Sequence, residues 1–154
     1  MKIVYLTAGA AGMYCGACLH DNALAVALRK AGEDLLLVPL YTPIRTDETD
    51  VSYHRVFFGG INVALQQKSS LFRHTPRWLD RLLDRPGLVT WLGRFRQSTN
   101  PRLLGEMTCS MLRGEQGRQR KELDKLTDWL SDQIGPEVIH LPNTLLSGLA
   151  RQFR

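Results

Sequence analysis

The first 43 residues alternate between apolar runs and a stretch with helical spacing. The runs Lys2–Thr7 and Leu35–Leu40 are apolar on both faces, which predicts two strands buried between helices. Between them, apolar side chains recur at spacings of three and four and predict a helix that Gly32 ends as a C-terminal cap. The predicted apolar face of this helix comprises Leu19, Ala23, Val26 and Ala27. Asp21 is expected in its first turn, where it favours the helix dipole.

The loop between the first strand and this helix contains Gly9, Gly12 and Gly16. Glycines let backbone N–H groups approach a ligand closely, and the first turn of a helix attracts a phosphate or another anion. We therefore expect a ligand site at this loop. Its spacing is neither the dinucleotide pattern G-x-G-x-x-G nor the phosphate loop G-x-x-x-x-G-K-[ST], so neither NAD binding nor NTP hydrolysis is indicated.

The middle of the chain changes from a strand pattern to a long helical pattern. Arg55–Phe58 predicts a third short strand, which Gly59-Gly60 follows. From about residue 62 to 133 the chain reads as helical, in pieces that proline and glycine interrupt. The breaks fall at Pro76, Pro86-Gly87, Asn100-Pro101 and Gly114–Gly117. The last piece has an apolar face of Leu123, Leu126, Trp129, Leu130 and Ile134 and a polar face of Lys121, Glu122, Lys125 and Asp128.

The last 18 residues return to a strand and a helix. Glu137–Leu141 predicts a fourth strand, and Asn143 is expected to cap a final helix, Thr144–Arg151. The whole order indicates an α/β fold, a Rossmann-like doubly wound parallel sheet with a helical insertion at about 62–134, between the third and fourth strands. In such sheets ligands bind at the carboxyl ends of the strands. We expect four segments to converge there, namely Gly9–Gly16, Tyr41–Pro43, Gly59-Gly60 and His140–Asn143.

Length and composition fit one ordinary globular domain. The chain has 154 residues and a mass of 17.4 kDa, with 44% apolar and 23% charged residues. Without a signal peptide or an apolar stretch of roughly 20 residues, a cytoplasmic protein is expected. The net charge of +5 is concentrated in Lys68–Lys125, which has 13 Lys and Arg against 6 Asp and Glu. This basic segment is either a solvated helical face or a surface for an anionic acceptor, a lipid surface or nucleic acid.

Cys15 and Cys18 form a C-x-x-C motif at the predicted start of the helix. This is the setting of a thioredoxin-like dithiol, in which the helix dipole lowers the pKa of the first thiol. Thioredoxins normally have a strand and a helix before the redox strand, whereas here that strand begins at residue 2. The alternative is that two small side chains pack a tight loop. Zinc is not indicated, because Cys109, His20 and His140 do not supply a second ligand pair at finger spacing.

His140 stands near the end of the fourth predicted strand, where an imidazole could orient or deprotonate a substrate hydroxyl. A lone histidine is more often a structural residue, so its spacing alone favours that role over a functional one. The three tryptophans occupy helical positions and are expected in the core rather than at a ligand site. They are Trp78, Trp91 and Trp129.

The segment GMYCGACLHDNALAVALRKAGEDLLLVPLYTP, residues 12–43, resembles the opening of GT-B glycosyltransferases, especially the retaining enzymes of family 4 and their starch and glycogen synthase relatives. Gly16 matches the second glycine of the family's loop, and Cys15 replaces the first. Ile139–Asn143 is similar to the family's second landmark, a strand end whose histidine faces the acceptor. With the segment FFGGINVALQQK, the likeness covers nearly the whole chain.

The resemblance implies that residues 1–154 are the N-terminal, acceptor-side domain of an enzyme that transfers a sugar from a nucleotide-diphosphate sugar to an acceptor hydroxyl. It implies His140 as the catalytic residue and no metal. The implied substrate-binding residues are Gly12, Tyr14, Cys15, Gly16, Thr42, Gly59, Gly60 and Asn143. The donor is held in this family mainly by a second Rossmann-like domain with a Glu-x7-Glu pair, which this chain lacks. We therefore expect Arg154 to be a truncation point and the chain alone to be inactive.

The resemblance also assigns the basic segment a role in acceptor choice, through a phosphorylated or membrane-borne acceptor, with peripheral membrane contact and no nucleic acid. Two alternatives remain from the residues themselves. One is a dithiol oxidoreductase that uses Cys15 and Cys18, and the other is a non-catalytic anion-binding module built on the basic segment.

Overall fold

The computed structural model describes residues 1–10, 13–58 and 101–153 of the 154-residue chain. The elements of the N-terminal half are strand β1 (Lys2–Thr7), helix α1 (Gly16–Lys30) and strand β2 (Asp34–Pro39). The C-terminal part comprises helix α5 (Pro101–Leu112), the 3-10 turn η2 (Gly114–Gln116), helix α6 (Arg120–Trp129), the π-helical turn η3 (Leu130–Ile134), strand β3 (Val138–His140) and the 3-10 helix η4 (Thr144–Leu149). No helix within these described ranges is long and apolar enough to cross a membrane.

The three strands form one parallel sheet in the order β2-β1-β3. Strand β1 pairs along its whole length with β2, from Lys2 beside Asp34 to Thr7 beside Pro39. On its other side Tyr5 lies beside His140 of β3. The predicted α/β class is confirmed at this level, as a small parallel sheet with helices.

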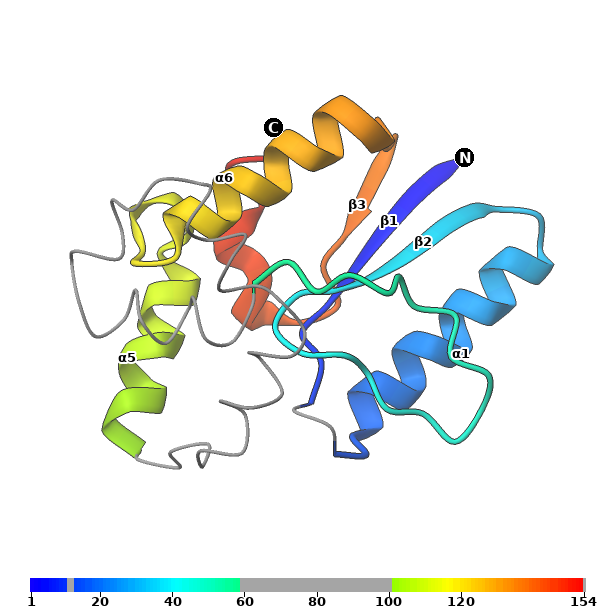
Figure 1. Ribbon diagram of the computed structural model, residues 1–154, viewed down its shortest axis with the longest axis horizontal. Helices are drawn as coiled ribbons and strands as arrows, with labels where there is room; N and C mark the ends of the chain where they lie inside the picture. The colour runs from blue at the N-terminus through cyan, green and yellow to red at the C-terminus, as the bar shows by residue number, and fades with distance from the viewer. Residues whose placement is uncertain (11–12, 59–100, 154) are drawn as a thin grey trace.

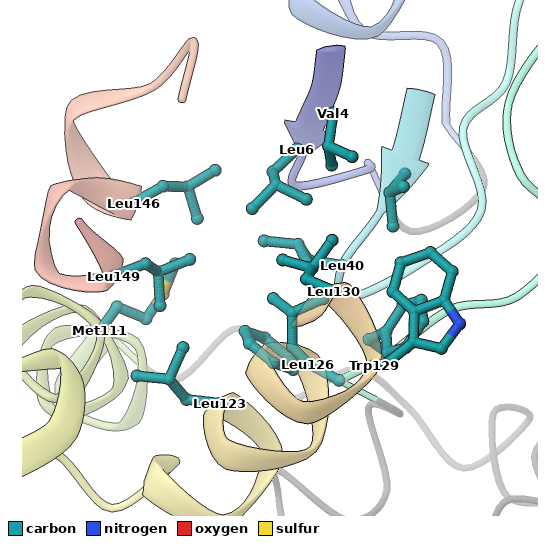
Figure 2. Packing of buried hydrophobic residues seen from close by; sticks show 13 residues of the cluster. Val4, Leu6, Leu40, Met111, Leu123, Leu126, Trp129, Leu130, Leu146 and Leu149 are labelled. Carbon is teal, nitrogen blue, oxygen red and sulfur yellow. The ribbon is translucent and has the colours of Figure 1, made fainter. Parts of the chain in front are cut away.

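Helices cover both faces of the sheet. Successive side chains of β1 point to opposite faces, so this strand contributes to the core on each side. Ile3 and Tyr5 pack with Leu35 and Leu37 of β2 against the buried side of α1. Val4 and Leu6 point the opposite way, toward α6 and η4, which Figure 1 shows on the far side of the sheet from α1. Figure 2 shows this second, larger cluster, in which Leu123, Leu126, Trp129 and Leu130 from α6 and η3 meet Leu146 and Leu149 from η4.

The predicted third strand, Arg55–Phe58, is wrong. Successive side chains of a strand point to opposite faces, but Phe57 and Phe58 are both buried in the cluster beneath α6. Residues 55–58 have no strand structure, and the isolated parallel bridge to Leu37 of β2 is formed by Ser52, just before them. Backbone bonds from Tyr53 N to Leu37 O, 2.7 Å, and from Phe58 N to Leu40 O, 2.6 Å, hold this segment in place.

The sequence also predicts the wrong buried face of α1. The residues that the helix buries are Cys18, Asp21, Asn22 and Ala25, whereas Ala23 and Ala27 are exposed. Asp21 does not lie in the first turn, because α1 begins at Gly16 and its first turn has no acidic residue. The spacing 18, 21, 22, 25 is as helical as the predicted one, but two of its members are polar. Both are buried because hydrogen bonds satisfy them, as described below.

The helices after residue 100 agree with the predicted breaks. Helix α5 begins at Pro101, and α6 runs through its π-helical turn to Gly135, a left-handed cap with φ 60°. Trp129 is buried in the core, as predicted, whereas Trp78 and Trp91 lie outside the described residues. Glu122 was expected on the polar face of α6 and is instead fully buried, with both carboxylate oxygens bonded to Lys125 Nζ at 3.1 and 3.2 Å.

The end of the chain is helical, but tighter and shorter than predicted. Residues Thr144–Leu149 form a 3-10 helix, and Asn143 caps it as expected, because its Oδ1 accepts a 2.9 Å bond from Leu145 N. The helix packs closely on the preceding elements. A Cβ added to Gly114, which has φ +53°, would lie 1.9 Å from Gly148 O, so backbone meets backbone at this contact.

Candidate ligand site at the carboxyl edge of the sheet

The strand order places a switch point between β1 and β3. From β1 the chain crosses through α1 to β2 on one side, and it later returns to β3 on the other side. Ligands of open parallel sheets bind outside the carboxyl ends of the strands where the order reverses in this way. The loop after Thr7 and the turn after His140 leave from this edge, which Figure 1 shows beside the start of α1.

Backbone contacts join the loops that follow β1 and β2. Leu40 N donates to Thr7 O at 2.8 Å, and Tyr41 N donates to Ala8 O at 3.1 Å, so the pairing continues beyond the strands. Gly9 then turns with φ 80°, and a Cβ at this position would lie 2.0 Å from Thr42 O. Only glycine fits this approach. Gly9 and Thr42, one from each of two segments predicted to converge, therefore lie in contact.

The first cysteine of the C-x-x-C motif stands at the N-cap of α1. Cys15 is half-buried and has extended backbone, and Cys18 is 2% exposed. The backbone amides of Cys18 and Ala17 lower the pKa of the Cys15 thiol, because they favour the thiolate at the start of the helix. Burial raises the pKa of Cys18 to about 11, with a further contribution from the charge of Cys15. The two thiols thus differ in both accessibility and acidity.

Asp21 lies one turn further along α1 and is 3% exposed. Its Oδ1 accepts a 2.7 Å bond from the Tyr5 hydroxyl, and its Oδ2 accepts a 2.6 Å bond from the Thr7 hydroxyl. His20 Nδ1 lies 3.5 Å from the same Oδ1. Burial raises the pKa of Tyr5, and the hydrogen bond to Asp21 raises it further. The hydroxyl therefore stays protonated and donates this bond. A buried carboxylate therefore lies directly behind the carboxyl end of β1.

His140 is the exposed end of β3 and lies over the central strand. Its ring centroid is 4.5 Å from that of Tyr5, with the planes tilted by 36°. Since Tyr5 also holds Asp21, one aromatic side chain connects the predicted catalytic histidine with the buried carboxylate. Asn143 is exposed, and its Oδ1 is used by the cap of η4. The side-chain amide of Asn143 also carries a nitrogen, which is a hydrogen-bond donor.

The segment after β2 is fastened to α1 by Asn22, which is fully buried. Its side-chain nitrogen donates to Thr49 O at 3.0 Å, and its Oδ1 accepts from Val51 N at 3.1 Å. At the same edge, the guanidinium of Arg45 lies 4.4 Å above the ring of Tyr14, which is 57% exposed. The predicted binding residue Tyr14 is therefore presented to solvent beside a cation.

Sequence reasoning missed Tyr5, Thr7, Asp21 and Asn22. A signal was present, since Asp21 and Asn22 share the helical spacing of Cys18 and Ala25, and polar residues within such a spacing indicate a built polar contact. The sequence pattern places Asp21 only in the first turn and indicates no role for Asn22. The predicted residues Gly12, Gly59 and Gly60 lie outside the described ranges, and Gly16 is the exposed first residue of α1.

The described part of the basic segment is partly neutralised. Arg118 pairs with Glu106 at 2.9 Å and Arg120 with Asp124 at 3.8 Å. A surface hollow of about 250 Å³ lies beside the first of these pairs and draws its lining from α5 and the turn after it, so it is separate from the sheet edge. Among residues 1–10, 13–58 and 101–153, no three His, Cys, Asp or Glu side chains gather as a metal site would require.

The edge combines donors, a carboxylate, an imidazole and a thiol around one switch point. Such an arrangement can hold a polar ligand by backbone amides and the exposed imidazole, and it can also carry thiol chemistry. No protein-family model, no curated protein and no solved structure matches the chain.

Proposed function

We propose that this chain is the acceptor-side domain of a retaining glycosyltransferase that uses a nucleotide-diphosphate sugar as donor. In this proposal the three strands belong to a Rossmann-like doubly wound sheet, and a second Rossmann-like domain supplies the donor site. The protein needs no metal and acts in the cytoplasm, with peripheral membrane contact through the basic segment.

The observation that carries the proposal is the placement of His140 across the switch point from the glycine loop. The first landmark of the family follows β1 in the chain and the second lies at the end of β3, and these two strands are adjacent and parallel, since Tyr5 pairs directly with His140. This supports one shared site, because the carboxyl ends of neighbouring parallel strands open into one crevice. His140 is exposed, as a residue that meets an acceptor must be.

Each side chain then has a role. His140 binds and orients the acceptor hydroxyl, and its ring is supported from below by Tyr5. The N-terminal amides of α1 lie beside the phosphates or the acceptor, where the helix dipole favours negative charge. Asn143 donates from its side-chain nitrogen, while Tyr14 offers an exposed ring on which a sugar face can stack.

A binding experiment on the 154-residue chain tests the acceptor side. In ¹⁵N NMR spectra, titration with maltotriose, mannobiose and UDP is expected to shift the amides of Ala8–Ala10, Leu141, Asn143 and Thr144 for at least one probe. His140→Ala should weaken that binding about tenfold or more, which corresponds to about 1.4 kcal/mol. His54→Ala is the matched control, because His54 is also an exposed histidine but follows β2 and packs beside Tyr53.

A transfer assay tests the need for the donor domain. The chain alone, incubated with UDP-, ADP- and GDP-hexoses and each acceptor, should release no measurable nucleoside diphosphate. Robust turnover by the chain alone contradicts the two-domain proposal. Binding that survives His140→Ala and falls steeply with salt identifies an anion-binding module instead.

A further inference from the structure

The C-x-x-C motif is built asymmetrically, and the proposed sugar chemistry uses neither thiol as a nucleophile. Cys15 is half-buried at the N-cap, whereas Cys18 is buried in the cluster between α1 and the sheet. Both are free thiols. Their separation by two residues places both at the first turn of one helix, on the side that faces the loop after β1.

We propose that Cys15 and Cys18 form a redox-active dithiol whose substrate is a low-molecular-weight disulfide, with Cys15 as the attacking thiol and Cys18 as the resolving thiol. The proposal does not depend on sugar transfer, since its chemistry needs no nucleotide and no second domain.

The position of Cys15 supports its role as the nucleophile. The backbone amides of Cys18 and Ala17, in the first turn of α1, lower the pKa of the Cys15 thiol because they favour its thiolate. The hydrogen bond between the two thiols also lowers the pKa of Cys15, and it raises the pKa of Cys18. The accessible thiol is therefore the acidic one, and the enclosed thiol keeps its proton until it is needed.

The enclosure of Cys18 supports its role in resolution. An entering disulfide can reach Cys15 from solvent but cannot reach a side chain that is 2% exposed. Cys18 is in turn in direct interaction with the Cys15 sulfur, which the entering reagent modifies. The negative charge of Asp21, held by Tyr5 and Thr7, is a smaller opposing contribution that disfavours both thiolates.

The reaction balances in two steps. In the first, the Cys15 thiolate attacks one sulfur of the small disulfide, forms a mixed disulfide and releases one thiolate, which takes up a proton from solvent. In the second, Cys18 loses its proton to solvent and attacks the Cys15 sulfur, which breaks the mixed disulfide and releases the second thiol. The protein dithiol is oxidised by two electrons to a Cys15–Cys18 disulfide, and the substrate is reduced to two thiols.

The experiment uses the full 154-residue chain with Cys109→Ser as the parent, because Cys109 is exposed on α5 and would react as an ordinary surface thiol. Oxidised glutathione is the probe, at pH 7, and intact-mass and peptide-mass spectrometry give the products. The parent is expected to lose two hydrogens and release two glutathione molecules. Cys18→Ser in the parent should stop with one glutathionyl group on Cys15, and Cys15→Ser should remain unmodified.

The rates provide the second measurement. In a chain that carries Cys18→Ser but retains Cys109, the initial reaction of Cys15 should exceed that of Cys109 by about tenfold or more. Folding of each variant is checked by circular dichroism, and Cys18→Ala replaces Cys18→Ser if the buried hydroxyl prevents folding. Equal rates for Cys15 and Cys109, or a parent whose mixed disulfide at Cys15 never resolves, overturn the proposal.

Discussion

The hydroxyl of Tyr5 donates a 2.7 Å hydrogen bond to the carboxylate of Asp21, and this bond joins the central strand to the buried face of α1. Thr7 donates to the second oxygen at 2.6 Å, so two hydroxyls from one strand satisfy one buried carboxylate. A buried charge without such partners costs several kcal/mol. The first crossover of the sheet is therefore fixed by a polar contact and by apolar packing together.

Replacement of Asp21 by alanine should lower the free energy of unfolding by about 2–4 kcal/mol, because it leaves the hydroxyls of Tyr5 and Thr7 buried without their acceptor. Asp21→Asn should cost less, about 1–2 kcal/mol, since its amide still offers one acceptor. Urea denaturation measures both. The exposed Asp47→Ala is the control and should change stability by less than about 0.5 kcal/mol. A loss for Asp21→Ala no larger than that of the control contradicts a structural role for the carboxylate.

Gly9→Ala tests the close approach of the first two loops. The residue has φ +80°, and an added Cβ would meet both Thr42 O, at 2.0 Å, and Thr42 Oγ1, at 2.6 Å. We expect a loss of about 2 kcal/mol or more in the free energy of unfolding, from backbone strain and displacement of the Thr42 loop.

Gly16→Ala is the matched control for this variant. A Cβ at Gly16 would have nothing within 4 Å, and alanine is the better helix former at the first position of α1. Its stability should be unchanged or higher by up to about 1 kcal/mol. Similar losses for both variants would show that the contact with Thr42 is not the cause.

The elements that the sequence predicts well are those in which hydropathy and burial agree. Strands β1 and β2 are apolar on both faces and have helices on both sides, so their pattern is unambiguous. The prediction fails where local pattern and tertiary contact diverge. Phe57 and Phe58 have the composition of a strand, but both side chains are buried in the same cluster. Their burial depends on tertiary packing, which the local sequence does not show.

The candidate site divides in the same way. The Asn143 cap depends on local turn chemistry that a sequence displays, and the meeting of Gly9 with Thr42 follows from the pairing of β1 with β2, whose patterns the sequence also displays. Asp21 depends on hydroxyls that are 16 and 14 residues away, which no local window connects to it. On this face of α1, long-range hydrogen bonds decide which polar residues are buried. A local sequence pattern does not show these bonds.

The buried pair on α6 gives a further prediction. Lys125→Met removes both bonds to the fully buried Glu122 carboxylate and should cost about 2–3 kcal/mol in urea denaturation. Addition of Glu122→Gln to that variant should restore part of the loss, because it removes the buried charge that Lys125 no longer faces. Arg120→Met on the same helix breaks an exposed pair at 3.8 Å and should change stability by less than about 0.5 kcal/mol. If Arg120→Met costs as much as Lys125→Met, burial does not govern this pair.

The thiol of Cys18 should make stability fall at alkaline pH. Its pKa is about 11 in the folded protein and about 9 when unfolded, so the folded state holds the proton more tightly. By linkage, this contribution is fully present below about pH 9 and is lost as the pH rises toward 11, and it amounts to on the order of 2 kcal/mol. Tyr5 and Tyr41, whose pKa values burial also raises, add to the decline in the same direction.

The measurement is therefore the difference in free energy of unfolding between the wild-type chain and Cys18→Ala, from urea denaturation at pH 8, 9.5 and 11. The contribution of the tyrosines cancels in this difference. The stability of the wild type relative to Cys18→Ala should decrease between pH 8 and pH 11, whereas Cys109→Ala, at an exposed thiol, should leave the decline unchanged. A constant difference between wild type and Cys18→Ala over this range would mean that Cys18 titrates alike in both states.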